Sequence, residues 1–301
     1  MDEVTRGARA LVLCPDIRSF NYDLDATERL AEAEGLALAI GVEIEHSEIL
    51  PIRQMQPNTL FGSGQVENIK IACEQHDCEL VIVDGALTPI QQRNLEDKLK
   101  RKVIDRTGLI LEIFGERAAT AEGRLQVELA HLDYQQSRLV RSWTHLERQK
   151  GGIGLRGPGE TQLETDRRLL NIRIKQINKR LDKVRKQREQ GRQSRRKAEI
   201  PTVSLVGYTN AGKSSLFNVL SDDKVYVQDQ LFATLDPTLR RIDFERDVSV
   251  ILADTVGFIR HLPHDLVDAF RSTLQETAEA QLLLHVIDSA DENRDANIKE
   301  V

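Results

Sequence analysis

No stretch of this sequence approaches the roughly 20 consecutive apolar residues that a membrane-spanning helix needs. The chain opens with Met-Asp-Glu-Val in place of an apolar leader, so a secretory signal is not indicated. Cysteine is scarce, and an odd number of three thiols gives no basis for a disulfide framework. Together these absences predict a cytoplasmic protein without a membrane span.

Two of the cysteines, Cys73 and Cys78, flank His76 and raise the question of a metal site. The cluster straddles an expected helix end and strand start, and it lacks the second ligand pair of a structural zinc site. We therefore favour a packed, reduced pair of thiols.

Aromatic residues make up only 4% of the 301 residues, whereas 30% are charged, which indicates long solvated helices. The net charge of −6 is unevenly distributed. Residues 167–197 hold fourteen lysines and arginines against two acids, a net of +12, so the rest of the chain sums to −18. A basic segment in an acidic protein favours RNA binding over the alternative of a solvated helix face.

The first hundred residues alternate strand and helix signals, which predicts a small parallel α/β domain. Thr88-Pro89 combines a capping residue with proline at a helix start. Gly62-Ser63-Gly64 could bind an anion, but a plain helix start is the better interpretation. The expected strands and helices are Leu11–Leu13, Leu24–Ile40, a half-buried strand around Val42–Ser47, a helix face of Val66, Ile69 and Cys73, Leu80–Val83, the helix after Thr88, and Val103–Ile104.

Heptads follow from Glu122. Thr161-x-x-Glu164 reads as a capping box that begins the second heptad helix, and Gly191–Glu199 as a polar linker. Two heptad helices joined by a short loop predict an antiparallel coiled-coil hairpin. The heptad positions are Leu125, Leu129, Leu132, Leu139, Trp143 and Leu146, then Leu163, Leu170, Ile174, Ile177, Leu181 and Val184.

The glycine-rich tip of this hairpin contains a formal G-x-G-x-x-G pattern from Gly152 to Gly157. A dinucleotide site is not favoured, because the pattern follows a helix instead of a strand. A tip loop with Arg156 at its centre is better suited to contacting a partner.

Gly207-x-x-x-x-Gly212-Lys213-Ser214 lies between an apolar run and an apolar-periodic segment, the strand–loop–helix context of a phosphate-binding loop. The glycines allow the backbone to approach a ligand closely, and the loop amides converge on phosphate oxygens. Lys213 supplies a charge to the outer phosphates, and the Ser214 hydroxyl can ligate Mg²⁺. The alternative, an ordinary glycine-rich turn, is disfavoured by the length of the match.

Downstream of the loop, Asp254 ends an expected strand and Gly257 follows three residues later. Such an acid holds Mg²⁺ through water, and the Gly257 amide can sense the γ-phosphate. Thr234 lies in a segment without periodicity and can ligate Mg²⁺ only while that phosphate is present. This combination predicts a GTPase-type switch and disfavours an ATPase. The expected elements are a hairpin of Leu239–Phe244 and Val248–Ala253, a helix over Pro263–Ala280 and a buried strand Leu282–Ile287.

The segments 151–168, 207–218, Phe232-Ala-Thr-Leu-Asp-Pro-Thr238 and Asp254-Thr-Val-Gly-Phe-Ile259 resemble the motifs of the HflX GTPases. The resemblance runs from about Leu11 to the end. It implies a cytoplasmic, monomeric GTPase that binds GTP, GDP and the large ribosomal subunit, approaches ribosomal RNA, and acts in splitting or rescue of stalled ribosomes. It further implies Mg²⁺ as cofactor, and K⁺ if Asn210 recruits that ion; a hydrogen bond that rigidifies the loop is the alternative role of Asn210.

The sequence departs from other GTPases at two points, one that bears on hydrolysis and one that bears on the selection of guanine. Phe258 stands where many place a water-orienting glutamine, and a phenyl ring cannot hydrogen-bond the attacking water. No catalytic residue is therefore assigned, and slow hydrolysis until a partner completes the site is implied. The Asn-Lys-x-Asp motif that selects guanine does not occur before Val301, which suggests a C-terminally truncated family member with an impaired site.

We expect three parts: an α/β domain over 1–116, a basic hairpin over 117–198 with its tip at 150–160, and an incomplete P-loop GTPase domain over 199–301. A non-catalytic RNA- or ribosome-binding adaptor is the alternative function. The expected nucleotide-binding residues are Gly207, Tyr208, Thr209, Asn210, Ala211, Gly212, Lys213, Ser214, Ser215, Phe232, Ala233, Thr234, Asp254, Thr255, Val256 and Gly257. The expected RNA-binding residues are Arg156, Arg167, Arg168, Arg173, Lys175, Lys179, Arg180, Lys183, Arg185 and Lys186.

Overall fold

The computed structural model describes residues 5–149, 158–197, 200–221, 231–244, 248–260, 262 and 271–301. The chain forms two compact units. One comprises Met1–Ile113 and His131–Ile174, and the other Phe114–Ala130 and Lys175–Val301. Each unit therefore contains one part of each of the two long helices.

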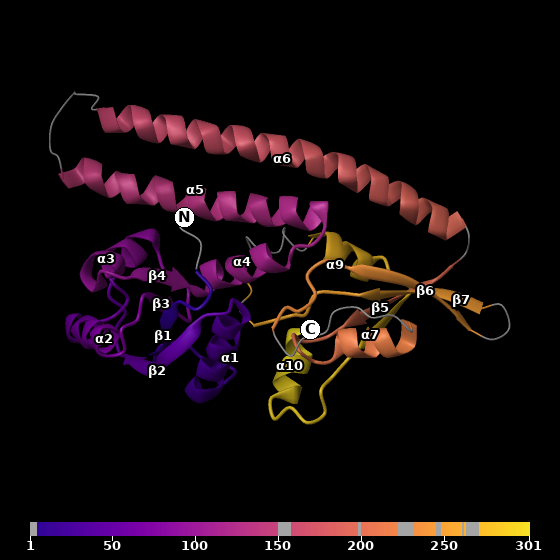
Figure 1. The fold of residues 1–301 in the computed structure, drawn as a ribbon, viewed down its shortest axis with the longest axis horizontal. Coiled ribbons are helices and arrows are strands. Elements are labelled where there is room, and N and C mark those ends of the chain that lie inside the picture. The colour runs from indigo at the N-terminus through magenta and orange to yellow at the C-terminus, as the bar shows by residue number, and fades with distance from the viewer. Residues whose placement is uncertain are drawn as a thin grey trace. The chain divides into compact units, whose positions relative to one another are not determined.

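The first unit contains a parallel four-stranded sheet of order β2-β1-β3-β4, with the connecting helices drawn in indigo and violet in Figure 1. The predicted alternation of strands and helices is confirmed. Thr88 caps its helix by accepting from the Gln91 amide, and Gly62 precedes a plain helix start. The elements are β1 Arg9–Ile17, α1 Ala26–Ala39, β2 Glu43–Ile52, α2 Ser63–Gln75, β3 Leu80–Val83, α3 Pro89–Leu99 and β4 Lys102–Asp105.

Cys73 and Cys78 are buried in the core of this sheet as free thiols. Burial raises the pKa of the Cys73 thiol to about 11, so the group stays protonated at neutral pH. His76 stacks its ring on that of His46, with centroids 4.7 Å apart. Cys73 and Cys78 thus serve as packed apolar side chains.

Two of the described helices were not predicted from the sequence, the short α10 (Arg294–Glu300) and α4 (Arg106–Arg117). α4 follows β4 without a loop, and its residues Leu109–Leu111, Ile113 and Phe114 are all buried. The segment is amphipathic, and Asp105 caps its start by accepting from the Gly108 amide (2.8 Å), but no turn separates it from β4, so it does not stand out as an element of its own.

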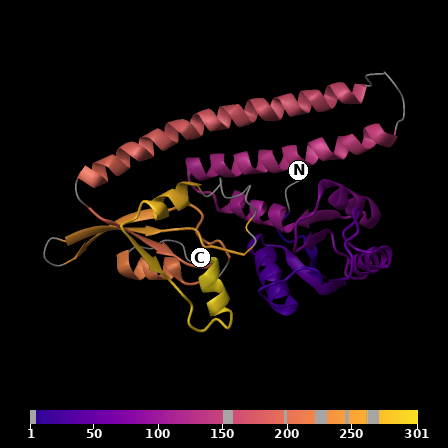
Figure 2. The ribbon, with the colours of Figure 1, turned by 180° about the vertical axis from the view of Figure 1, so that it is seen from behind.

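The two long helices α5 (Ala121–Gln149) and α6 (Pro158–Lys197) form the predicted hairpin and run alongside each other in Figures 1 and 2. Within the first unit the Gln136 amide donates to Asn171 (3.0 Å), and within the second Arg188 pairs with Glu122 (2.6 Å). The sequence offset of these pairs is that of an antiparallel arrangement. Among the α6 residues whose burial the structure describes, the fully buried ones are Ile177 and Leu181, two of the predicted heptad positions.

On α5 the predicted heptad residues Leu125, Leu129 and Leu132 are only half-buried. A second face of the same helix is more deeply covered. Its Tyr134 hydroxyl donates to the Asp105 carboxylate (2.8 Å), and Arg138 pairs with the same carboxylate (2.8 Å). The helix therefore contacts the end of β4 as well as α6.

Two predictions about α6 are wrong. The helix begins at Pro158, so the predicted capping box Thr161-x-x-Glu164 lies inside it. Proline at the first turn costs nothing, because its missing N–H would have no helical partner there. The helix also continues through Gly191 to Lys197, where a linker was expected. One exposed glycine costs only about 1 kcal/mol in a helix that is otherwise rich in lysine, arginine and glutamine.

The second unit contains a four-stranded sheet of order β6-β7-β5-β8 (orange to yellow in Figure 1). β5 pairs in parallel with β7 and β8, and β6 pairs with β7 in the predicted antiparallel manner. The elements are β5 Thr202–Val206, α7 Lys213–Ser221, β6 Thr238–Phe244, β7 Val248–Asp254, α9 Arg271–Ala278, β8 Leu282–His285 and α10 Arg294–Glu300. Residues 263–270 of the predicted Pro263–Ala280 helix lie outside the described part.

Leu282–Ile287 was predicted to be a buried strand; the strand is present, but the prediction that it is buried is wrong. β8 forms, but Leu282, Leu283 and Leu284 are 52%, 50% and 37% exposed. β8 is the last strand of its sheet, and only β5 pairs with it within the described residues. An apolar run predicts a strand, but it does not tell which neighbours cover the strand.

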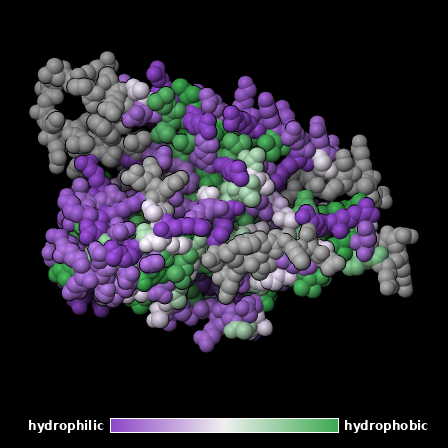
Figure 3. Space-filling view, viewed as in Figure 1, coloured by the Kyte–Doolittle hydropathy of each residue, from purple (hydrophilic) through white to green (hydrophobic). Residues whose placement is uncertain are grey.

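None of the described helices has the length and apolar composition to cross a membrane. In Figure 3 hydrophilic residues dominate the visible surface over α6, in keeping with its charged composition.

Candidate nucleotide-binding site

The predicted phosphate loop connects β5 to α7. Gly207 has φ +155°, and a Cβ there would lie 2.3 Å from the Val286 carbonyl oxygen, so only glycine fits. Gly212 has φ +87°, a conformation that side chains disfavour. These two positions explain the glycines of the motif, and they turn the chain into a helix that begins at Lys213.

Lys213 is buried beneath this loop. Its Nζ donates to the carbonyl oxygens of Tyr208 (2.7 Å) and Gly207 (3.2 Å). Burial lowers the pKa of Lys213 to about 8, which Asp254 partly counteracts. The ammonium group thus has carbonyl acceptors but no close anionic partner among the described residues, and a phosphate would supply one.

Three oxygen-bearing side chains converge beside the lysine. The Ser214 hydroxyl donates to Asp254 Oδ2 (2.6 Å), Thr234 Oγ1 lies 3.1 Å from the same oxygen, and the two hydroxyl oxygens are 2.7 Å apart. Asp254 is fully buried, and its Oδ1 has no hydrogen-bond partner in the described part of the chain. Burial raises the pKa of this carboxyl group. An unpartnered buried carboxylate oxygen beside two hydroxyls fits a hard divalent cation such as Mg²⁺.

The segment after Asp254 lies directly against the phosphate loop. Thr209 donates its amide to the Phe258 carbonyl (2.7 Å), and the Phe258 amide donates to the Gly207 carbonyl (3.1 Å). A Cβ on Gly257 would lie 2.5 Å from Thr209 Cα, so the approach requires glycine. Gly257 thereby lies directly against the phosphate loop, while Phe258 contributes no polar side chain.

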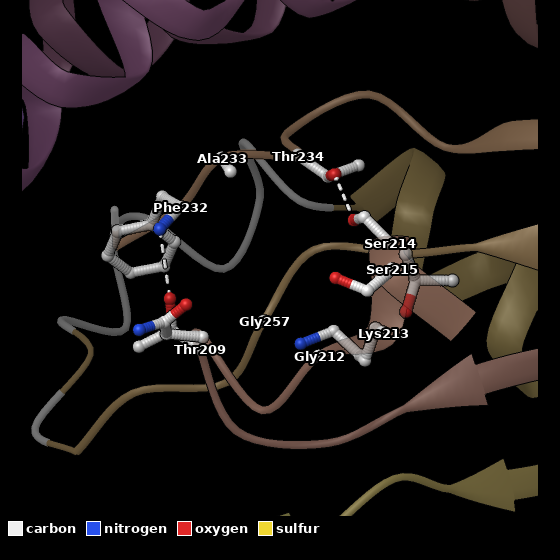
Figure 4. Close-up of a pocket in the computed structure, with 11 residues that line it drawn as sticks. Thr209, Gly212, Lys213, Ser214, Ser215, Phe232, Ala233, Thr234 and Gly257 are labelled. Carbon is white, nitrogen blue, oxygen red and sulfur yellow. Dashed lines mark hydrogen bonds between the residues drawn. The ribbon is translucent and has the colours of Figure 1, made fainter. Parts of the chain in front are cut away.

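A pocket is formed by eleven residues, and Figure 4 shows how they surround it. Phe232 borders it with its amide donating to Thr209 Oγ1 (2.9 Å), and Thr234 lies opposite with its hydroxyl toward Ser214. All eleven belong to the sixteen nucleotide-binding positions expected from the sequence. They are Thr209, Asn210, Gly212, Lys213, Ser214, Ser215, Phe232, Ala233, Thr234, Thr255 and Gly257.

Arg260 was not expected at the site. It is 5% exposed, its guanidinium lies over the Tyr208 ring (5.2 Å), and its amide donates to the Tyr208 hydroxyl (3.2 Å). The guanidinium also donates to Asn297, whose amide donates to Asp291 (2.6 Å). The position of Arg260 three residues after Gly257 was the only available signal; nothing in the sequence connects it to Asn297.

The expected RNA-binding residues lie on α6, except Arg156, which is outside the described residues. Arg173 and Arg185 are half-buried, whereas the other seven are exposed. The exposed residues are Arg167, Arg168, Lys175, Lys179, Arg180, Lys183 and Lys186.

Three families match successive parts of the chain. Residues 27–115 match "GTP-binding GTPase N-terminal", 117–195 match "GTP-binding GTPase Middle Region", and 202–301 match "50S ribosome-binding GTPase". Among solved structures, the SsGBP–GDP complex has a TM-score of 0.56 at 26% identity, covering 97% of this chain and 75% of that one. A GTP-binding protein from Sulfolobus solfataricus in complex with GDP has a TM-score of 0.51 at 25% identity, covering 97% and 74%.

Curated relatives give the same result. "GTPase HflX" of Escherichia coli is 60% identical over 94% of this chain, and that of Magnetococcus marinus is 54% identical over 92%. That of Caldanaerobacter subterraneus is 48% identical over the whole chain. The chain spans 66%, 65% and 69% of the lengths of these three relatives. With 48% identity over more than two thirds of a relative's length, the chain belongs to the HflX family of GTPases.

Proposed function

We propose that this chain is part of a switch that binds and hydrolyses GTP and associates with the large ribosomal subunit. The observation that carries the proposal is the meeting of Ser214, Thr234 and Asp254 beside the buried Lys213. The names of the relatives and the GDP in both similar structures support guanine nucleotides as ligands.

In this proposal the loop amides and Lys213 hold the phosphates. Mg²⁺ would be held by Ser214 and Thr234 directly and by Asp254 through water, and it would neutralise charge on the phosphate oxygens. Lys213 must give up its two carbonyl acceptors, at least in part, to reach a phosphate. The burial that lowers its pKa strengthens its attraction to an anion, because the site is shielded from water.

Hydrolysis by the chain alone should be slow. Phe258 is bonded to the phosphate loop only through its backbone, and its ring cannot orient a water molecule. A group supplied by a partner accelerates other phosphate-loop GTPases by about 10³- to 10⁵-fold. We infer that the large ribosomal subunit is that partner, with the exposed cations of α6 contacting ribosomal RNA.

The family match to a 50S ribosome-binding GTPase supports this partner. We further propose the role implied by the family resemblance, splitting or rescue of stalled ribosomes in the cytoplasm by a monomer. We also propose that the chain is divided into an α/β domain, a basic hairpin and a GTPase domain.

The test is a titration of the chain, and of a version extended to the length of its relatives, with GDP, GTP and ATP. Guanine nucleotides should bind with Mg²⁺, and nucleotide should change the affinity for large subunits. The matched control is Lys299→Ala, an exposed lysine on α10, against Lys213→Ala. Subunit binding that ignores nucleotide in the extended chain would favour the non-catalytic adaptor.

A further inference from the structure

The segment Phe232–Asp236 carries Thr234 and contacts a distant part of its own compact unit. That part is the corner between α4 and α5, residues Phe114–Arg124, which we call the α4–α5 corner. More than a hundred residues separate the two segments in the sequence. The contacts occur at both ends of Phe232–Asp236.

At one end, the Asp236 carboxylate lies at the start of α5. Oδ2 accepts from the backbone amides of Ala119 (2.9 Å) and Thr120 (2.8 Å), and Oδ1 accepts from the Thr120 hydroxyl (2.6 Å). The Thr120 hydroxyl in turn accepts from the Gly123 amide (2.9 Å). Asp236 therefore satisfies amides that have no partner within the helix, and its negative charge suits the positive end of the helix dipole.

Gly123 makes this approach possible. A Cβ at this buried position would lie 2.2 Å from Asp236 Oδ1. Glycine is a poor helix former compared with alanine, so its presence in the first turn of α5 is explained by the carboxylate against it.

At the other end, the Phe232 ring is 1% exposed and meets the Phe114 ring edge to face, with centroids 5.0 Å apart and planes at 89°. Phe232 also has φ +55°, a left-handed conformation that is uncommon for a bulky residue and persists where the surroundings hold it. Its amide is held by Thr209 Oγ1.

Thr234 lies midway between these two anchors, two residues from each. With both ends fixed, the backbone of Thr234 has little freedom, and its hydroxyl lies 2.7 Å from Ser214 Oγ and 3.1 Å from Asp254 Oδ2. The three residues from Phe232 to Thr234, and likewise those from Thr234 to Asp236, reach at most about 10 Å when fully extended. Because the chain between Thr234 and each anchor is so short, moving either anchor by a few ångströms would also move Thr234.

We propose that Asp236 and Phe232 are positioning residues that fix Thr234 at the magnesium site by holding Phe232–Asp236 against the α4–α5 corner. This rests on the proposed function, in which Thr234 ligates Mg²⁺ bound with nucleotide. Because coupling between two events is reciprocal, Mg²⁺–nucleotide binding also strengthens the contact between Asp236 and the start of α5.

The experiment breaks the Asp236 contact from each side. In Asp236→Asn, the amide cannot accept from both backbone amides and the Thr120 hydroxyl in the same geometry. Gly123→Ala leaves every residue of the nucleotide pocket unchanged and introduces a better helix former. Gly191→Ala is the matched control, since it is also a glycine-to-alanine change within a helix but has open space around its Cβ.

The measurement is the affinity for a non-hydrolysable GTP analogue with Mg²⁺ and with EDTA. Both test variants should lose about ten- to a hundredfold of the affinity gained from Mg²⁺, the scale found for groups that orient metal ligands. The affinity of each variant in EDTA should stay within about twofold of that of the unmodified chain. The double variant should bind no more weakly than either single variant, because both substitutions break the same contact between Asp236 and the start of α5. Gly191→Ala should match the unmodified chain.

The possible outcomes distinguish failure of the positioning role of Asp236 and Phe232 from failure of the proposed nucleotide-binding function. If the unmodified chain shows no Mg²⁺-dependent binding, the proposed function fails. If it does and either folded test variant keeps the full Mg²⁺ gain, the positioning role is wrong. Equal losses with Mg²⁺ and with EDTA would show a merely structural contact and would also overturn it. One folded variant is enough, because each removes the contact independently.

Discussion

Replacing Asp254 by asparagine should make the free protein more stable than the unmodified chain. The same substitution should reduce the stability that the protein gains from Mg²⁺ and nucleotide. The Asp254 carboxylate is fully buried with Oδ1 unpartnered in the described part of the chain, and burial raises its pKa. A raised pKa means that folding disfavours the ionised form, so at neutral pH the charge lowers the free energy of unfolding. The amide of Asn is neutral, and its oxygen can still accept from Ser214 and Thr234. Removing the buried charge should raise the free energy of unfolding by about 1 to 2 kcal/mol. This gain already allows for the lost attraction between Asp254 and Lys213, which acts in the opposite direction.

The opposite effect is expected with ligand. Removing the charge should weaken Mg²⁺ binding about ten- to a hundredfold. A ligand at one hundred times its dissociation constant stabilises a protein by about 2.7 kcal/mol, and a tenfold weaker one by about 1.4 kcal/mol at the same concentration. Thermal unfolding of both proteins, with and without Mg²⁺ and GDP, measures both quantities.

The control is Asp23→Asn, an exposed carboxylate of the first unit that should change neither quantity measurably. A free Asp254→Asn protein that is less stable than the unmodified chain, or an undiminished gain from Mg²⁺ and GDP, would refute this reasoning about the buried charge.

Lys213→Ala should weaken nucleotide binding about 10- to 100-fold while Lys299→Ala does not, and equal affinities would exclude the assigned site. Because burial lowers the pKa of Lys213 to about 8 and only its protonated form attracts phosphate, GDP affinity in EDTA should fall as pH rises from 7 to 9; a flat profile contradicts this. If Asn210 recruits K⁺, exchange for Na⁺ should slow ribosome-stimulated hydrolysis, whereas equal rates favour its loop-rigidifying role. RNA affinity of α6 should fall with salt, with a log–log slope near −0.9 per neutralised phosphate; salt independence would exclude electrostatic binding.

The local parts of the fold and site could be predicted from the sequence. The phosphate loop is contiguous, and its glycines are fixed by geometry at the loop itself, as Gly207 shows against the Val286 carbonyl. Thr88 and Pro89 likewise mark their helix start through neighbours three residues away. In such cases the residue types that a structure requires stand next to one another in the chain.

Contacts between distant segments could not be predicted. The Asp236 carboxylate and Thr120 are 116 residues apart, and neither residue type is unusual where it stands. α4 was missed for a different reason: it follows β4 directly, so no turn in the sequence separates the strand from the helix. The exposure of β8 depends on which segments lie beside it, which its own apolar residues do not specify.

The first turn of α5 carries one further consequence: it links Thr234 mechanically to the helix that follows. The part of α5 that lies in this compact unit, Ala121–Ala130, is a stiff rod about 15 Å long. A tilt of about 10° at the end held by Asp236 would move Ala130 by about 3 Å, the arc of a rod of that length. Loss of one carboxylate contact beside the nucleotide would therefore displace side chains at the far end of this rod. Conversely, a load applied to this part of α5 would act on Thr234 through Asp236.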